Sequence, residues 1–274
     1  MMIVFSDLDG TFLTSRKQIP ARNLEALGAL AAAGIPFVPC SGRALTGILQ
    51  SILEHPATRY AISTNGAVVT DIKTGKALRR ADLGQERALD LFEIARCHDV
   101  TFDIFANGRI YTRRDVFDRF NGFVSDTLLL ASMRAMRTPY DGDTAELLRT
   151  LDHIERVSLY WRDPADRDAL LAEIKRVPDV SCVRSYPTNF EISDARATKG
   201  AALAWLCNHL GIPLDEAISF GDNLNDVSMI EKAGTGVAME NAEPEIKAIA
   251  DAITLANDEG GVGEFILQRL AGNR

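Results

Sequence analysis

The sequence contains few cysteines, and they form no recognisable ligand pair. Four cysteines are spread across the 274 residues without a CxxC motif: Cys40, Cys97, Cys182 and Cys207. A disulfide framework or a structural zinc site needs cysteines at short, regular spacings, so we expect neither. Isolated buried thiols are the simpler interpretation.

Hydrophobic runs of membrane-spanning length are also missing. A transmembrane helix needs roughly 20 consecutive apolar residues, and the apolar runs of this chain are far shorter. The chain opens with Met1-Met2-Ile3-Val4-Phe5-Ser6-Asp7, which has no basic segment and soon reaches an acidic residue. This opening predicts a buried strand instead of a signal peptide. We therefore expect a cytoplasmic protein with no membrane partner.

Positive charge is in deficit. The chain has 30 lysines and arginines against 38 acidic residues, which gives a net charge of −8. Nucleic-acid binding depends on clustered basic side chains that neutralise phosphates, so a nucleic-acid partner is not expected. An anionic small molecule is compatible with this balance, because a bound metal reverses the local sign of a site.

Short apolar runs alternate with amphipathic helical patterns at both ends of the chain. This alternation predicts βαβ units and a parallel sheet covered by helices on both faces. The composition, 46% hydrophobic and 25% charged, is that of a globular protein with a substantial core. The expected strands lie at residues 3–5, 35–40, 61–63, 217–220, 236–239 and 253–255.

The middle of the chain has a different pattern, with short strands, separate helices and a polar stretch at residues 138–144. We interpret it as an α+β domain inserted into an α/β domain. The expected boundaries lie near residues 83 and 188. Residues 1–83 and 188–274 then form a Rossmann-like parallel-sheet core, and residues 84–187 form the inserted domain.

An acidic motif, Asp7-Leu8-Asp9-Gly10-Thr11, directly follows the first expected strand. Open α/β sheets bind ligands at the carboxyl ends of their strands, which is where this motif falls. A turn at Gly10 can aim the two carboxylates differently, so that one attacks phosphorus while the other moves a proton. The structural alternative is a turn whose acidic residues cap a helix.

Three further motifs occupy comparable positions. Ser41-Gly42-Arg43 follows the second strand, where a hydroxyl and backbone N–H groups can hold phosphate oxygens. Lys199-Gly200 starts a helix, where a lysine is unfavourable for the helix dipole unless it faces solvent or an anion. Residues 221–226, Gly-Asp-Asn-Leu-Asn-Asp, supply oxygen ligands for a hard cation, or alternatively a helix cap. Together the four motifs favour phosphoryl transfer.

These motifs resemble, in order, the four motifs of the haloacid dehalogenase superfamily of phosphatases. The similarity to its Cof-type branch, subfamily IIB, continues through residues 65–67, 237–242 and 257–260. It covers most of the two terminal blocks, whereas the middle domain matches only in size and pattern. The resemblance implies an Mg²⁺-dependent phosphatase that works through an aspartyl-phosphate intermediate.

The resemblance also implies roles for individual residues. Asp7 is then the nucleophile and a metal ligand, and Asp9 is the general acid/base, its backbone carbonyl also binding the metal. Asp222 completes the protein ligands to Mg²⁺, and Asp226 supports them from outside the coordination sphere. The residues expected to contact the phosphoryl group are Leu8 (through its backbone N–H), Ser41, Gly42, Arg43, Lys199 and Asn225, the role of Arg43 being the least defined.

The spacing of the motifs locates a cap domain. Between Arg43 and Lys199 lie 155 residues, far more than one sheet crossover needs. We therefore expect the insertion to close over the core, exclude water and shape substrate choice, as caps of this family do. The expected partner is a small phosphorylated metabolite. The family acts on sugar phosphates, nucleotides, flavin mononucleotide and pyridoxal phosphate.

Two other functions stay open. A phosphomutase or phosphotransferase would keep Asp7 and Asp9 but return the phosphate to an acceptor, and product analysis would separate it from a hydrolase. A catalytically silent metabolite-binding protein on the same fold would release no phosphate. The sequence does not decide between a monomer and a homodimer.

Overall fold

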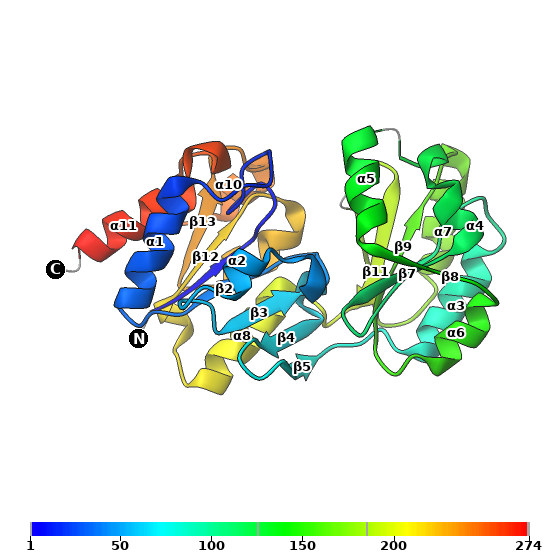
Figure 1. Cartoon of the computed structure of the whole chain (residues 1–274), viewed down its shortest axis with the longest axis horizontal. Coiled ribbons are helices and arrows are strands. Elements are labelled where there is room, and N and C mark those ends of the chain that lie inside the picture. Colours follow the sequence, from blue (N-terminus) through cyan, green and yellow to red (C-terminus); the bar gives the residue numbers. More distant parts are fainter. Residues whose placement is uncertain (1, 125, 185, 273–274) are drawn as a thin grey trace. The chain divides into compact units, whose positions relative to one another are not determined.

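The computed structural model describes residues 2–124, 126–184 and 186–272. The chain divides into two compact units (Figure 1). The core unit comprises Met1–Arg43, Ile48–Arg80 and Thr198–Arg274, and the inserted unit comprises Ala44–Gly47 and Ala81–Ala197. No helix in this described part of the chain has the length and apolar character needed to cross a membrane.

A five-stranded parallel sheet forms the centre of the core unit, in the order β14-β13-β12-β1-β2. The α/β fold class predicted from the alternating pattern is therefore confirmed. The strands are β1 (Ile3–Ser6), β2 (Phe37–Pro39), β12 (Ala217–Gly221), β13 (Thr235–Met239) and β14 (Ala252–Thr254).

An antiparallel three-stranded sheet lies beside β2. Two parallel bridges, Phe37 with Thr58 and Cys40 with Ile62, join β2 to the segment that contains its first strand. This strand was expected at residues 61–63 as part of the parallel sheet; the bridges place it parallel to β2, and it also begins an antiparallel meander. Its strands are β3 (Tyr60–Ser63), β4 (Val68–Asp71) and β5 (Lys76–Arg80).

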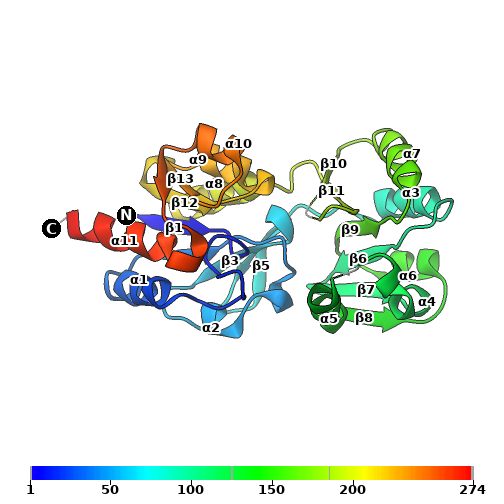
Figure 2. The same cartoon turned by 90° about the horizontal axis from the view of Figure 1, so that it is seen from above.

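Helices cover both faces of the parallel sheet, because each helix carries one apolar side. Helix α1 (Ala21–Ala32) packs against α11 (Gly261–Gly272) on one face, and α8 (Lys199–Leu210) packs against α9 (Val227–Lys232) on the other (Figure 2). The shorter helices of the core unit are α2 (Gln50–Leu53) and α10 (Pro244–Ile249), with single 3₁₀ turns at η2 (Thr64–Gly66), η4 (Leu214–Glu216), η5 (Leu224–Asp226) and η6 (Asn257–Glu259).

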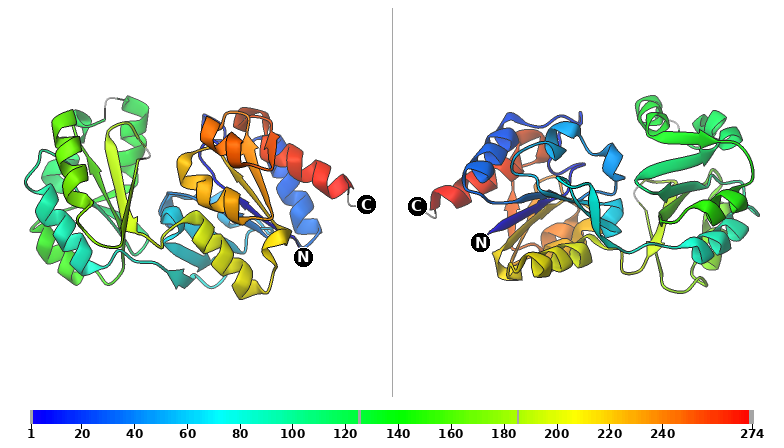
Figure 3. Two further views of the ribbon diagram at one scale, coloured as in Figure 1. Left: turned by 180° about the vertical axis from the view of Figure 1, so that it is seen from behind. Right: turned by 60° about the horizontal axis from the view of Figure 1, so that its bottom comes forward.

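The inserted unit, drawn mainly in green in Figure 3, contains a six-stranded sheet. The strand order is β10-β11-β9-β6-β7-β8, and the sheet is antiparallel except between β7 and β8. Helices α3 (Gln85–Ala95), α6 (Thr144–Thr150) and α7 (Pro164–Ile174) bury their apolar sides on one face of it. The strands are β6 (Asp103–Ala106), β7 (Arg109–Arg113), β8 (Arg137–Tyr140), β9 (Ile154–Tyr160), β10 (Val180–Val183) and β11 (Asn189–Asp194). The remaining helices are η1 (Leu45–Gly47), α4 (Arg114–Asp118), η3 (Phe120–Gly122) and α5 (Thr127–Ala135).

The bounds of the inserted unit differ from the expected 84–187. Its long segment runs from Ala81 to Ala197, so residues 188–197 belong to it and not to the core unit. The reason is that β11 pairs with both β9 and β10. Its side chains Phe190 and Ile192 lie in the apolar cluster of the inserted unit.

A buried ion pair joins β8 to β6 in the inserted unit. The Arg137 guanidinium donates to Asp103 Oδ2 from Nη2 (2.6 Å) and from Nε (3.0 Å), and Thr112 Oγ1 donates to Asp103 Oδ1 (2.5 Å). The guanidinium also lies over the Phe120 ring, 4.6 Å from its centroid. Both charged side chains are buried, so each depends on the other for compensation of its charge.

Replacing Arg137 with Met should leave the Asp103 carboxylate buried without its cation. We expect the free energy of unfolding to fall by about 3–5 kcal/mol, measured by urea unfolding. The matched control, Asp103→Leu with Arg137→Met, removes both charges and should recover most of that loss. A double variant no more stable than the single one would show that lost packing, and not a buried charge, is the cause.

Candidate active site

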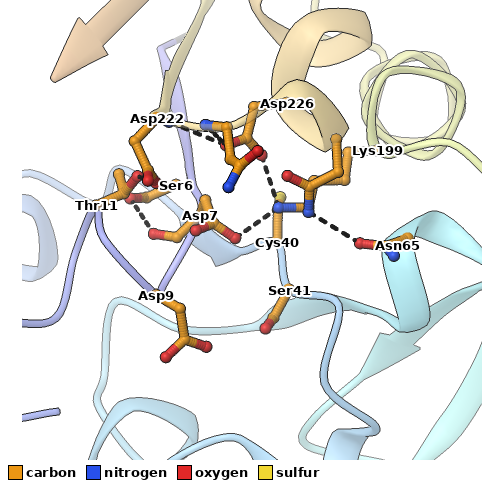
Figure 4. A network of polar contacts seen from close by, with 12 residues as sticks. Ser6, Asp7, Asp9, Thr11, Cys40, Ser41, Asn65, Lys199, Asp222 and Asp226 are labelled. Carbon is orange, nitrogen blue, oxygen red and sulfur yellow. Dashed lines mark hydrogen bonds and ion pairs between the residues drawn. The ribbon is translucent and has the colours of Figure 1, made fainter. Parts of the chain in front are cut away.

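Three neighbouring strands bring the predicted motifs to one edge of the core sheet. Because β1 lies between β12 and β2 and runs parallel to both, the residues that follow these strands are neighbours. Asp7 follows β1, Ser41 lies just beyond β2, and Asp222 follows β12. Figure 4 shows these side chains gathered around one centre.

A buried lysine lies at that centre. Lys199 Nζ is 2.5 Å from Asp7 Oδ1 and 2.6 Å from Asp226 Oδ1, and its side chain is 0% exposed. Lys199 is the first residue of α8, and Thr198 fixes this helix start because its hydroxyl accepts a hydrogen bond from the Ala201 N–H (3.1 Å). The lysine that the sequence placed at a helix start therefore meets two carboxylates and not solvent.

Asp226 shapes the loop that follows β12. Its Oδ2 accepts hydrogen bonds from the backbone N–H groups of Asp222 (3.0 Å) and Asn223 (3.1 Å), while its Oδ1 meets Lys199. Thr11 Oγ1 donates to Asp222 Oδ1 (2.6 Å). The loop is thus held from within by Asp226 and from the first motif by Thr11, which fixes the direction of the Asp222 carboxylate.

Burial and repulsion between carboxylates dominate the electrostatics. Burial raises the pKa of Asp7; Lys199 opposes this rise, and the Asp226 and Asp222 charges add to it. Burial also raises the pKa of Asp222 to about 6, with the Asp226 charge adding to the rise against the Thr11 hydrogen bond. Burial alone would lower the pKa of Lys199, but Asp226 and Asp7 more than offset it, so this pKa is raised. One ammonium group therefore faces three carboxylates.

The same carboxylates fit a metal ion. One carboxylate oxygen from each of Asp7, Asp222 and Asp226 can be chosen so that all three lie within 4.8 Å of one another. Oxygen donors of this kind are the ligands of hard cations such as Mg²⁺. A divalent cation would also relieve the repulsion that raises the pKa of Asp7 and Asp222.

Several of the residues expected to contact a phosphoryl group have polar partners within the core unit. Ser41 Oγ accepts a hydrogen bond from the Arg43 N–H (3.1 Å), and Asn225 Nδ2 donates to Asn65 Oδ1 (3.1 Å). A Cβ at Gly42 would lie 3.0 Å from that same Asn65 oxygen, so the backbone is open there because glycine is present. Leu8 as a whole residue is fully buried, and the expected contact of its backbone N–H with a phosphate stays a prediction.

Asp9 stands apart from this cluster. Its carboxylate accepts hydrogen bonds from Arg43 Nε and Nη2 (both 2.7 Å), and Lys17 Nζ lies 2.6 Å from its Oδ1. Burial alone would raise the pKa of Asp9, but the hydrogen bonds and charges of Arg43 and Lys17 outweigh it and lower this pKa.

Comparison with known proteins agrees with this geometry. The family model for haloacid dehalogenase-like hydrolases matches residues 4–266. The chain belongs to that family. Phosphatase YwpJ of Bacillus subtilis is 33% identical over 286 residues, covering 97% of this chain and 99% of the relative. Pyridoxal phosphate phosphatase YbhA of Escherichia coli is 27% identical over 275 residues, covering 98% of each.

A solved haloacid dehalogenase-like hydrolase from B. subtilis has 33% sequence identity and a TM-score of 0.82, covering 97% of this chain and 99% of that one. The predicted resemblance to this superfamily and the predicted enzyme class, a hydrolase, are therefore confirmed. The individual residue roles that the resemblance implies stay predictions. The structure brings Asp7, Ser41, Lys199, Asp222 and Asp226 to one edge of the sheet.

Three polar residues at this site were not predicted as site residues: Thr11, Asn65 and Lys17. Thr11 and Asn65 lie in segments that resemble the superfamily, and they hydrogen-bond to Asp222 and Asn225, respectively. Lys17 lies outside every motif, and its contact with Asp9 arises from the fold of the turn that carries it.

The turn at Thr64–Gly66 approaches the start of α8 closely. Asn65 has left-handed backbone angles (φ 54°, ψ 29°), and Gly66 follows with φ 98°. A Cβ at Gly66 would lie 2.2 Å from the Thr198 carbonyl oxygen. This distance leaves no room for a side chain, so the glycine lets the Asn65 turn contact the helix that begins at Lys199.

Gly66→Ala should therefore destabilise the protein through a clash as well as through backbone strain. We expect a loss of about 2 kcal/mol or more in the free energy of unfolding. Gly75→Ala is the matched control, because Gly75 also has positive φ (69°) but open space around it, and should lose only about 1 kcal/mol. Equal losses in urea unfolding would contradict the importance of the close approach to α8.

Proposed function

We propose that the protein is an Mg²⁺-dependent phosphatase that hydrolyses small phosphorylated metabolites through an aspartyl-phosphate at Asp7. The observation that carries this proposal is the Asp7 carboxylate at the end of the central strand, held by the buried Lys199 beside Asp222 and Asp226. The phosphatase names of the two relatives described above support it.

Asp7 and Asp222 would hold the metal through their carboxylates, with the backbone carbonyl of Asp9 as a further ligand. The ion supplies positive charge that lets a phosphate dianion approach a carboxylate. Lys199 contributes a second positive charge on the nucleophile itself. Asp226 keeps both the lysine and the Asp222 loop in place through its two oxygens.

The reaction then proceeds in two displacements. An Asp7 carboxylate oxygen forms a bond to phosphorus while the bond to the leaving oxygen breaks, and Asp9 gives its proton to that oxygen. Water next attacks the phosphorus of the aspartyl-phosphate, Asp9 takes a proton from this water, and Asp7 is released with inorganic phosphate. Ser41, the Gly42 backbone and Asn225 orient the phosphoryl oxygens throughout.

The substrate class is a phosphomonoester such as a sugar phosphate, a nucleotide or a related metabolite. The name of the relative YbhA includes pyridoxal phosphate, which makes that compound a reasonable member of a test panel. The inserted unit, expected from the spacing of the motifs to act as a cap, would supply contacts to the leaving alcohol.

Asp7→Asn should abolish phosphate release while leaving the fold intact, because an amide cannot form the aspartyl-phosphate. We expect a loss of roughly 10⁴-fold or more in kcat, measured as phosphate released from a panel of phosphorylated metabolites. Circular dichroism checks the fold of the variant. Wild-type protein that transfers phosphate to a second sugar, without releasing it, would instead favour a phosphomutase.

Mg²⁺ should stabilise the folded protein independently of any substrate. At a concentration of 100 times its Kd, an ion that binds only the folded state adds about 2.7 kcal/mol, and we expect a rise in melting temperature of about 5 °C or more. NaCl at equal ionic strength is the control. Asp222→Asn removes one carboxylate, so it should be at least as stable without Mg²⁺ and lose most of the rise. An undiminished rise in that variant would contradict the assigned site.

A further inference from the structure

One turn of the core unit contacts both loops that carry the proposed metal ligands. Residues 240–243 follow β13, which lies beside β12 and runs parallel to it. In this turn the Asn241 Nδ2 group donates to the Gly10 carbonyl (2.8 Å), and the Glu243 N–H donates to the Asp222 carbonyl (2.9 Å). The turn therefore joins the loop after β1 to the loop after β12.

The Asn241 side chain is exposed, and both ends of its amide have a partner. Besides the bond from Nδ2 to Gly10, its Oδ1 accepts a hydrogen bond from the Asn257 N–H (2.9 Å). A rotated amide would set its oxygen against the Gly10 carbonyl and its NH₂ group against the Asn257 N–H, so the two partners define one orientation. Asn257 continues the series of contacts, because its Nδ2 donates to the Leu13 carbonyl (2.9 Å). The loop after β1 is thus held at two of its carbonyls.

Gly10 in turn lies against the Asp222 carboxylate. A Cβ at Gly10 would be only 2.4 Å from Asp222 Oδ2, so the Gly10 main chain borders that oxygen. The neighbouring Thr11 hydroxyl donates to Asp222 Oδ1 (2.6 Å). Residues 10 and 11 therefore restrict where both oxygens of this carboxylate lie, and a shift of their loop would change both restrictions.

We propose that Asn241 is a positioning residue for the magnesium site. It restrains Gly10, which adjoins the Asp9 carbonyl, a proposed metal ligand, and borders the Asp222 carboxylate. The segment 237–242 resembles the superfamily, and the proposed reaction uses none of its residues. Mg²⁺ needs near-ideal octahedral geometry, so displacement of two of its ligands weakens its binding. This inference rests on the metal site of the proposed function.

Asn241→Ala removes the hydrogen bonds with Gly10 and Asn257 and leaves every proposed metal ligand in place. Isothermal titration calorimetry of the EDTA-treated protein without substrate measures its affinity for each ion. We expect the Kd for Mg²⁺ to rise about three- to tenfold, at or below the range for residues that directly hold a metal ligand. The Kd for Ca²⁺ should rise by about twofold or less, because Ca²⁺ accepts flexible coordination.

Ser15→Ala is the matched control. The Ser15 hydroxyl donates to Asp258 Oδ2 (2.8 Å), so this variant also removes an exposed hydrogen bond from the loop after β1, but at a residue that does not adjoin a proposed ligand. Its Kd for both ions should equal the wild-type value. Melting temperatures of both variants without metal should stay close to that of the wild type, because surface substitutions rarely change stability much.

An unchanged Mg²⁺ affinity in Asn241→Ala would overturn the proposal, and so would an equal loss of Mg²⁺ and Ca²⁺ affinity or the same effect from Ser15→Ala. A lower melting temperature with an unchanged Kd would make Asn241 a purely structural residue. If the wild type binds no Mg²⁺, or Asp222→Asn binds it equally well, the metal site of the proposed function fails and this inference fails with it. Wild-type protein that binds Mg²⁺ through Asp222 but releases no phosphate contradicts the phosphatase proposal alone.

Discussion

The contact of Lys199 with Asp7 and Asp226 is the interaction on which the rest of the core unit depends. Its ammonium group is fully buried and lies within 2.6 Å of both carboxylates. A buried charge is tolerated only when it is paired and hydrogen-bonded, so the end of β1, the loop after β12 and the start of α8 must all meet at this nitrogen. The ion pair with Asp7 joins residues 192 positions apart in sequence, so the contact also closes the core unit around the long insertion.

The site residues that could be predicted from the sequence are those that directly follow an apolar strand. Asp7, Ser41 and Asp222 follow apolar strands, and parallel strands bring their carboxyl ends to one edge. Asn65 and Lys17 could not be predicted in this way, because both need left-handed backbone angles. Their partners, Asn225 and Asp9, are also set by the tertiary fold and not by spacing.

The inserted unit shows a similar limit. Its general α+β character followed from the sequence, but the polar stretch at residues 138–144 hid part of β8, which spans Arg137–Tyr140. β8 lies at the edge of the sheet, where a proline such as Pro139 is tolerated because its missing N–H breaks no ladder. Arg137 is buried there only because Asp103 compensates its charge. Because β8 depends on a distant carboxylate and on its edge position, its local sequence gives little indication of a strand.

The electrostatics of the site follow from the same buried contacts. Three carboxylates face one ammonium group, and burial raises the pKa of both Asp7 and Asp222, so their charged forms are under strain until positive charge arrives. Asp9, the fourth carboxylate, avoids this strain because Arg43 and Lys17 compensate it on the other side of the turn. The proposed Mg²⁺ would compensate the other three carboxylates, whose mutual repulsion otherwise costs stability. Because the same burial and repulsion raise the pKa of Asp7 and Asp222, the proposed binding of a cation and the ionisation of the proposed nucleophile would be coupled.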